Sequence, residues 1–333
     1  IGCGFVGSSS AFALMESGLF NELVLIDVNK EKAEGEAMDI SHGLPYVRRM
    51  DIYAGDYSDC KDAGIIIITA GAGQKPGETR LDLVNKNVAI FKSIIPEIVK
   101  YNKDAILLVV SNPVDILTYV TLKLSGFPKN RVIGSGTVLD SARLKYLLGK
   151  HLDVNPKSVH AYIIGEHGDS ELAVWSSANV SGIPITDFCE LRGHKTNHNE
   201  NEQALYEEVK NSAYEIIKKK GATYYGIALS VRRICESIVH DEHSILPVSS
   251  YHEERINYDL EDICMSVPAI VGSNGIQQVL KIRLDHNEQN ALKSCSPVRY
   301  AAARLMDAMS SGSPRPYTYR RSNTFFFAAV SIR

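Results

Sequence analysis

The sequence has no long hydrophobic run, so it offers no candidate for a membrane-spanning helix. Its longest apolar stretches, residues 64–69 and 105–110, have the length of buried strands, whereas a membrane helix needs about 18 apolar residues. The pattern of a signal peptide is also missing. We therefore expect no association with a membrane.

Closely spaced cysteine pairs are absent too. The six cysteines are scattered, and no Cys-x-x-Cys pair occurs among Cys3, Cys60, Cys189, Cys235, Cys264 and Cys295. Isolated cysteines in a long chain are typical of reduced thiols and do not suit a structural zinc site. We expect a cytoplasmic protein that holds no metal.

An excess of positive charge is likewise absent. The 333 residues include 36 Lys and Arg against 39 Asp and Glu, which makes the formal net charge −3. Nucleic-acid-binding proteins usually carry a basic surface, so we expect no nucleic-acid partner. The chain length and the 44% of hydrophobic residues suffice for two domains, each with its own core.

Residues 1–135 alternate short apolar runs with helical patterns, which is typical of βαβ units. The alternation predicts an α/β fold with a doubly wound parallel sheet, the Rossmann arrangement that binds dinucleotides. The predicted strands are 23–27, 64–69, 105–110 and 131–134, and the predicted helices are 8–17, 30–42 and 80–102.

Residues 136–293 show a looser pattern, which predicts a second, mixed α+β domain that binds the substrate. Its predicted helices are 202–220 and 224–238, and its predicted strands are 160–164, 244–249 and 263–271. Residues 294–333 have no clear amphipathic period and include a stretch rich in Ser, Pro, Gly and Tyr. We expect a poorly ordered tail there.

A glycine-rich motif, G-x-G-x-x-G, occupies residues 2–7 and leads into a helical pattern. In a dinucleotide site the first glycine, Gly2, permits a tight turn, and Gly4 lets the backbone approach a pyrophosphate. Gly7 lets helix and strand pack closely, and with Phe5 and Val6 it places a helix N-terminus at the phosphates. A plain glycine-rich turn is the alternative.

The position of Asp27 adds context to this motif. Asp27 ends the predicted second strand and lies 20 residues after Gly7 (27 − 7), the spacing of the acid that binds the adenosine ribose. An acid there repels a 2′-phosphate and favours NAD over NADP. The alternative is that Asp27 only caps the helix that follows the strand. A strand is expected before Gly2, and Ile1 is its one residue in the sequence.

The segment Gly165-Glu166-His167-Gly168-Asp169 carries the clearest signal of chemistry. His167 lies between glycines at a predicted strand end, where a neutral imidazole is able to take a hydroxyl proton. Asp140 and Arg143 stand three apart, on one face of a helix, as a partner for the imidazole and a clamp for a carboxylate. A structural histidine and a surface ion pair are the alternatives.

Two further segments follow predicted strands. Residues 71–80 form a loop whose glycines and proline suit a mobile lid that carries Arg80. Ser111-Asn112-Pro113 is a polar turn at a strand end, where open α/β sheets bind ligands. Taken alone, each segment also fits an ordinary solvated loop or turn.

Residues 1–292 resemble the lactate/malate dehydrogenase family, particularly its bacterial lactate-specific members. The resemblance rests on the motifs above and on Gly221-Ala222-Thr223. It implies that His167 is the acid/base with Asp140 as its partner, that Arg80 polarises the substrate carbonyl, and that Arg143 binds the substrate carboxylate.

The resemblance also assigns contacts around the cofactor and the substrate. Asn112 would contact both the cofactor and the reacting oxygen, Gly71 and Ser135 the cofactor, and Thr223 the substrate. Gln74 stands where malate-specific members carry Arg, and a neutral side chain would leave a second carboxylate unpaired. Gln74 therefore favours pyruvate and lactate as substrates.

Two alternatives to this function stay open. One is the same chemistry on oxaloacetate, on malate or on another 2-hydroxy acid. The other is an inactive nucleotide-binding protein, because the first strand and the tail depart from the family's pattern.

The resemblance extends to assembly and regulation. It implies a homotetramer, and in many bacterial members fructose 1,6-bisphosphate binds at a subunit interface through an Arg and a His. Here these positions hold Lys145 and His160. Lys keeps the charge but loses the two-point geometry of Arg, so activation by this anion is an expectation that rests on charge alone.

Overall fold

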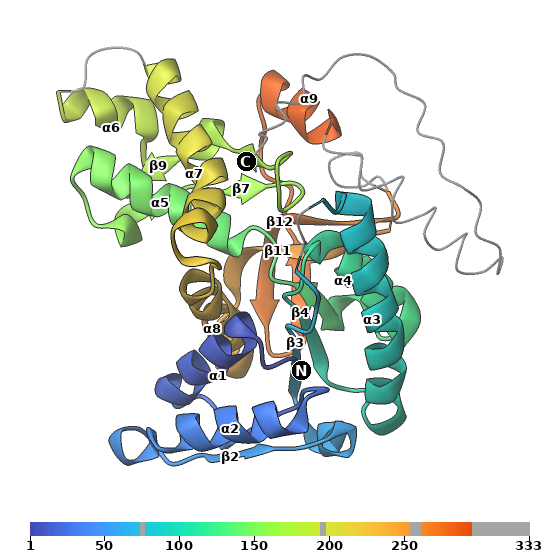
Figure 1. Cartoon of the computed structure of the whole chain (residues 1–333). Helices are drawn as coiled ribbons and strands as arrows, with labels where there is room; N and C mark the ends of the chain where they lie inside the picture. Colours follow the sequence, from blue (N-terminus) through green and yellow to red (C-terminus); the bar gives the residue numbers. More distant parts are fainter. Residues whose placement is uncertain (74–76, 194–197, 254–260, 295–333) are drawn as a thin grey trace.

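The computed structural model describes residues 1–73, 77–193, 198–253 and 261–294 (Figure 1). The α-helices are α1 (Phe5–Ser17), α2 (Lys30–Ser41), α3 (Arg80–Tyr101), α4 (Val114–Ser125), α5 (Val138–Leu152), α6 (Ile185–Leu191), α7 (His198–Lys220), α8 (Tyr225–Val239) and α9 (His286–Ser294). The strands are β1 (Glu22–Leu25), β2 (Asp51–Ala54), β3 (Ile65–Ile68), β4 (Ile106–Val109), β5 (Val132–Gly134), β6 (Val159–His160), β7 (Ile163–Ile164), β8 (Leu172–Ala173), β9 (Asn179–Val180), β10 (Ile183–Pro184), β11 (Ser244–His252), β12 (Ile263–Gly272) and β13 (Gly275–Val279).

A central sheet has the strand order β13-β12-β11-β5-β4-β3. Strands β3, β4 and β5 run parallel, as the βαβ pattern predicts, while β11, β12 and β13 join in antiparallel pairs. Helices α3 and α4 lie on one side of the parallel strands, and α1 and α8 lie on the other (Figure 1). The fold class is α/β, as predicted.

The parallel strands are apolar throughout because both of their faces are buried. Leu107 and Val109 of β4 belong to the core that includes Phe91 of α3. Ile106 and Leu108, which point the other way, belong to a second core with Val231 of α8. Alternate residues of one strand therefore stabilise two different helix layers.

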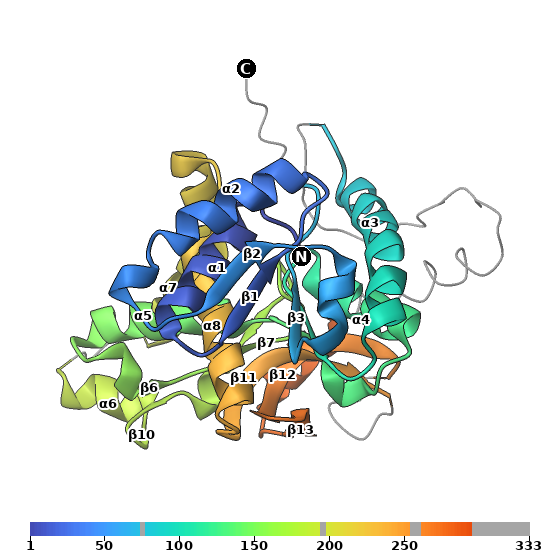
Figure 2. The same ribbon diagram turned by 90° about the horizontal axis from the view of Figure 1, so that it is seen from below.

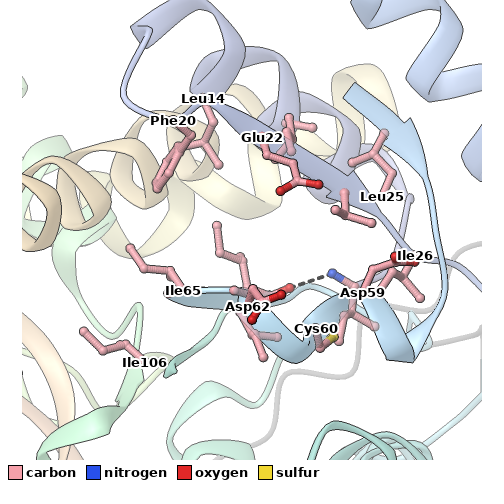
Figure 3. A pocket seen from close by; sticks show the side chains of 18 of the residues that line it. Leu14, Phe20, Glu22, Leu25, Ile26, Asp59, Cys60, Asp62, Ile65 and Ile106 are labelled. Atoms are coloured by element: carbon pink, nitrogen blue, oxygen red, sulfur yellow. Dashed lines mark hydrogen bonds between the residues drawn. The ribbon is translucent and has the colours of Figure 1, made fainter. Parts of the chain in front are cut away.

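Ile1 and Gly2 lie between β1 and β3. The amino group of Ile1 donates to Ile67 O at 2.7 Å, and the Gly2 N–H donates to Ile26 O at 2.7 Å. The position of the strand that was predicted before Gly2 is thus the middle of the sheet, between β1 and β3 (Figure 2). Next to Ile1, these two strands border a cavity of about 700 Å³, with side chains such as Phe20 and Ile106 in its lining (Figure 3).

Three details of the secondary structure differ from the prediction. Helix α1 begins at Phe5 and not at residue 8, because Gly4 is the extended residue that precedes the first turn. The predicted strand 160–164 is divided into β6, which pairs with β9, and β7, which pairs with β8. The other two strands predicted for the second domain, 244–249 and 263–271, become β11 and β12 and extend the first domain's sheet, with β11 paired to β5. The predicted tail, 294–333, lies outside the described residues apart from Ser294.

No helix in the described parts of the chain is long and apolar enough to cross a membrane.

Candidate functional site

The glycine-rich turn is built by close backbone packing. Gly2 has φ of +98°, and a Cβ atom there would lie 2.5 Å from the backbone nitrogen of Ala70. A Cβ on Gly7 would lie 1.8 Å from the carbonyl oxygen of Gly2. A Cβ on Gly4 would have no atom within 4 Å, so this glycine borders open space. The turn thus leaves room at Gly4 for a bound group to approach the backbone.

This opening suits the pyrophosphate of a dinucleotide. Helix α1 begins directly after Gly4, which provides no side-chain cap, so the positive end of the helix faces the open side. Asp27, at the end of β1, accepts the Cys3 N–H at 2.6 Å and the Asn29 N–H at 2.8 Å. These bonds hold its carboxylate beside the turn, where the adenosine ribose of NAD would bind. The residues present therefore fit the cofactor.

His167, Asp140 and Arg143 come together as a charged cluster. The Nδ1 atom of His167 lies 2.6 Å from Asp140 Oδ2, and Arg143 Nη1 donates to Asp140 Oδ1 at 2.7 Å. Helix α5 places Asp140 and Arg143 on one face, and His167 follows β7 in a turn between two glycines of positive φ. The structure therefore brings these three predicted site residues together.

The electrostatics of the cluster favour a protonated imidazole. Burial opposes the charge of His167, but the charge of Asp140 and the hydrogen bond with it prevail and raise the pKa of His167 to about 9. Burial also opposes the charge of Asp140, yet His167 and Arg143 keep the pKa of this carboxyl below its usual value. At neutral pH the pair is an imidazolium bound to a carboxylate.

Asp115 supports His167 from α4, and sequence reasoning missed it. Its Oδ2 atom accepts the His167 backbone N–H at 2.8 Å, and its Oδ1 atom accepts the Ser249 hydroxyl at 2.6 Å. Burial raises the pKa of Asp115 to about 6. An acidic residue inside the apolar segment 114–120 was the available signal, since a buried carboxyl needs a specific partner.

Glu171 is a second acidic residue that sequence reasoning missed. It precedes β8, it is 6% exposed, and its Oε1 atom is buried without a hydrogen-bond partner among the described residues. Burial, and next the charge of Asp140, raise the pKa of Glu171 to about 8. The signal in the sequence was a glutamate directly before the apolar run 172–175.

The ends of β3 and β4 are joined beside the cluster. The Ser111 hydroxyl donates to Ala70 O at 2.7 Å, and Asn87 of α3 donates to Asn112 O at 2.7 Å. The Asn87 Oδ1 atom also accepts the Ala72 N–H at 2.7 Å. These bonds fix the turn around the predicted ligand Asn112, whose side chain is exposed, and Asn87 is a supporting residue that the sequence did not reveal.

Ser135, Gly71 and Thr223 lie at three separate segments. Ser135 is buried at the end of β5, where its N–H donates to Val109 O at 2.8 Å. Gly71 follows β3 and is exposed, and Thr223 is half-buried just before α8. Their predicted contacts with cofactor and substrate stay predictions.

Two predicted substrate residues cannot be placed. Gln74 lies outside the described residues, and the same holds for the side chain of Arg80, whose backbone begins α3. Their predicted roles therefore stay predictions, as does the absence of a bound metal.

Lys145 and His160, the predicted anion-binding pair, lie on α5 and β6, which pack against each other. His160 is exposed, and Lys145 Nζ lies 5.9 Å from the centre of the Tyr162 ring. Burial, followed by the charge of Arg233, lowers the pKa of Lys145. The predicted role of Lys145 and His160 in binding an anion stays a prediction.

The fold and the site together define a class of protein, the α/β dehydrogenases that bind a dinucleotide at the carboxyl edge of a parallel sheet. The lactate/malate dehydrogenase NAD binding domain matches residues 1–134, and the lactate/malate dehydrogenase alpha/beta C-terminal domain matches residues 137–301. The chain belongs to the lactate/malate dehydrogenase family. The match to the C-terminal domain runs to residue 301, a few residues beyond the expected end of the resemblance at about residue 292.

Curated relatives and solved structures agree with this assignment. The chain is 59% identical over 293 residues to an L-lactate dehydrogenase of Acetivibrio thermocellus, covering 88% of this chain and 92% of the relative. It is 56% identical over 292 residues to L-lactate dehydrogenase 1 of Clostridium acetobutylicum, with the same coverage. The ligand-bound crystal structure of a minor L-lactate dehydrogenase from Enterococcus mundtii aligns with a TM-score of 0.87 at 45% identity, over 91% of this chain and 96% of that one.

Proposed function

We propose that the chain catalyses the reversible, NAD-dependent reduction of pyruvate to L-lactate. The observation that carries the proposal is the His167–Asp140–Arg143 cluster. It holds a proton donor, His167, together with Arg143, a side chain that binds carboxylates. Curated relatives that bear the name L-lactate dehydrogenase, at 53% to 59% identity, support the choice of substrate.

The cofactor, when bound, supplies or accepts the hydride at its nicotinamide ring. His167 donates a proton to the carbonyl oxygen of pyruvate, because its raised pKa keeps it charged at neutral pH. Asp140 orients the imidazole and stabilises its charge. Arg143 has donors besides the one that binds Asp140, and it binds the substrate carboxylate through two parallel hydrogen bonds.

The remaining roles follow from the family resemblance and are part of the proposal. Arg80 polarises the substrate carbonyl, Asn112 contacts the cofactor and the reacting oxygen, and Thr223 lines the substrate site. Gln74 selects pyruvate, because it offers no charge for a second carboxylate.

A substrate panel tests this function. NADH oxidation is followed by absorbance with pyruvate, oxaloacetate and a branched 2-oxo acid, with and without fructose 1,6-bisphosphate. We expect a clear preference for pyruvate, and a shift towards oxaloacetate in Gln74→Arg. A preference of the unmodified chain for oxaloacetate would reassign the substrate, and NADH binding without turnover would support the inactive nucleotide-binding alternative.

The proposal includes a homotetramer. Large apolar side chains are exposed on the adjacent helices α1 and α8: Phe5 is 70% exposed, Phe12 56%, Tyr225 67% and Leu229 58%. A face of this kind is typical of an interface between subunits.

Regulation and location complete the proposal. Fructose 1,6-bisphosphate would bind at Lys145 and His160, which are a half-buried cation on α5 and an exposed imidazole on β6, two elements that pack against each other. A cytoplasmic location is supported by the free, buried thiols of the five cysteines within the described residues.

A further inference from the structure

The backbone of Glu171 is held from two sides. Its N–H donates to Gly168 O at 3.1 Å, and its carbonyl oxygen accepts the hydroxyl of Tyr206 from α7. The residue therefore has a fixed place four positions after His167, and its side chain points into the protein with 6% of its surface exposed.

The carboxyl group of Glu171 lies next to the proton-transfer pair. One oxygen each of Glu171 and Asp140 and one ring nitrogen of His167 all lie within 4.8 Å of one another. Asp140 is engaged with both His167 and Arg143, whereas the buried Oε1 atom of Glu171 has no hydrogen-bond partner in the described parts of the chain. Packing does not require such a group, because an apolar side chain of the same size would avoid the cost of burying it.

The charged groups around Glu171 come from three elements. Helix α5 contributes Asp140 and Arg143, the turn after β7 contributes His167, and α7 contributes Lys210. Asp115 of α4 is a further charged group that acts on His167. Two neighbouring carboxylates repel each other, so Glu171 keeps its proton when Asp140 is ionised.

We propose that Glu171 is a positioning residue for the reaction. The protonation state of its carboxyl group determines how strongly His167 binds the imidazole proton. This inference rests on the proposed function. While Glu171 is protonated, His167 faces one carboxylate, that of Asp140. When Glu171 loses its proton, a second negative charge stabilises the imidazolium, so His167 remains a proton donor at higher pH.

The isosteric variant Glu171→Gln removes this charge. A unit charge about 5 Å away shifts a pKa by roughly half a unit even at the dielectric constant of water, so we expect a downward shift of His167 at least that large. The pH profiles of kcat/KM for lactate oxidation and for pyruvate reduction should therefore both move to lower pH in the variant. A merely structural defect would lower both profiles without moving their midpoints.

Two further variants test whether the effect comes from the charge of Glu171. Glu171→Met also removes the charge and leaves no polar group unpaired, so it serves if the Gln variant fails to fold. Glu288→Gln is the matched control, because Glu288 is another buried glutamate, 5% exposed, that bonds Ser176 instead of the cluster. The control should leave the pH profile unchanged.

The deciding measurement is an NMR titration of the His167 imidazole in the parent and in the three variants. It needs no turnover, so it tests the role of Glu171 even if the substrate assignment fails. A lower midpoint in both Glu171 variants, with the parent's midpoint in Glu288→Gln, supports the proposal. Equal midpoints in all four proteins would overturn it.

Discussion

At the scale of single residues, the site depends on how unlike charges are distributed around one imidazole. Asp140 Oδ2 lies 2.6 Å from Nδ1 of His167, and Asp115 Oδ2 accepts the backbone N–H of His167 at 2.8 Å. The spacing of Asp140 and Arg143 predicted their shared helix face, because a helix brings residues three apart together. Asp115 was not predictable, since its partner Ser249 lies 134 residues away and no local pattern joins them.

The pH dependence of turnover follows from the pKa of His167. The pKa is raised from 6.5 to about 9, so the proton donor persists to higher pH than a free histidine would allow. Pyruvate reduction should be nearly constant at neutral pH and fall about tenfold per unit as pH rises beyond about 9. Lactate oxidation, which needs the neutral imidazole, should rise about tenfold per unit up to about pH 9 and level off above it.

Steady-state kcat/KM against pH in both directions checks this prediction. In Asp140→Asn the charge that raises the pKa is lost, so the midpoint should move down towards 6.5. A midpoint near 6.5 in the unmodified chain would contradict the proposed role of Asp140.

At the scale of elements, short continuous apolar runs made the strands easier to predict than the strands with which they pair. The runs that became β3 and β4 are apolar because both faces of the sheet are covered. The run 160–164 has a similar composition, but exposed His160 pairs in one small sheet and buried Ile163 in another. Composition alone does not show where a strand changes its partner.

Two glycines of the same turn should respond differently to a methyl group. In Gly7→Ala the new Cβ would meet the Gly2 oxygen at 1.8 Å, so the turn must shift, at a cost of about 3 kcal/mol of unfolding free energy. In Gly4→Ala the methyl meets nothing, and stability should stay within about 0.5 kcal/mol.

The affinity for NADH, by contrast, should fall in Gly4→Ala although the stability of this variant is nearly unchanged. The methyl of Gly4→Ala enters the space where the pyrophosphate approaches, so we expect about tenfold weaker NADH binding, or about 1.4 kcal/mol, in a fully folded protein. Denaturant unfolding and fluorescence titration measure the two effects. Unchanged NADH affinity in Gly4→Ala would place the cofactor elsewhere.

At the scale of the whole molecule, one sheet runs through both predicted domains. Strand β11 meets β5 through Ser249 and Gly134, and a Cβ on Gly134 would lie 2.7 Å from the Cβ of Ser249. In the same region Ser249 donates a hydrogen bond to Asp115, which in turn accepts the backbone N–H of His167, so the site contains residues of both segments. The sequence predicted both sets of strands, but pairing across 115 residues (249 − 134) leaves no local signal.

The exposed apolar face of α1 and α8 predicts how the chain assembles. Leu229→Lys places a charge on this face at a position that is 58% exposed, so the subunit should fold normally while the proposed tetramer dissociates. Tyr101→Lys, at the end of α3 on the other side of the sheet, is the control. Light scattering after size exclusion measures the mass, and a tetrameric Leu229→Lys protein would remove this face from the interface.

The most direct test of the account is the turnover of His167→Gln beside its affinity for NADH. His167 is the proton donor of the proposed reaction and is not part of the glycine-rich turn, so only one of the two quantities should change. We expect kcat for pyruvate reduction to fall about 100-fold to 10,000-fold, while the NADH dissociation constant stays within about twofold. A variant that retains kcat within about tenfold of the parent would contradict the assignment of His167 as the acid/base.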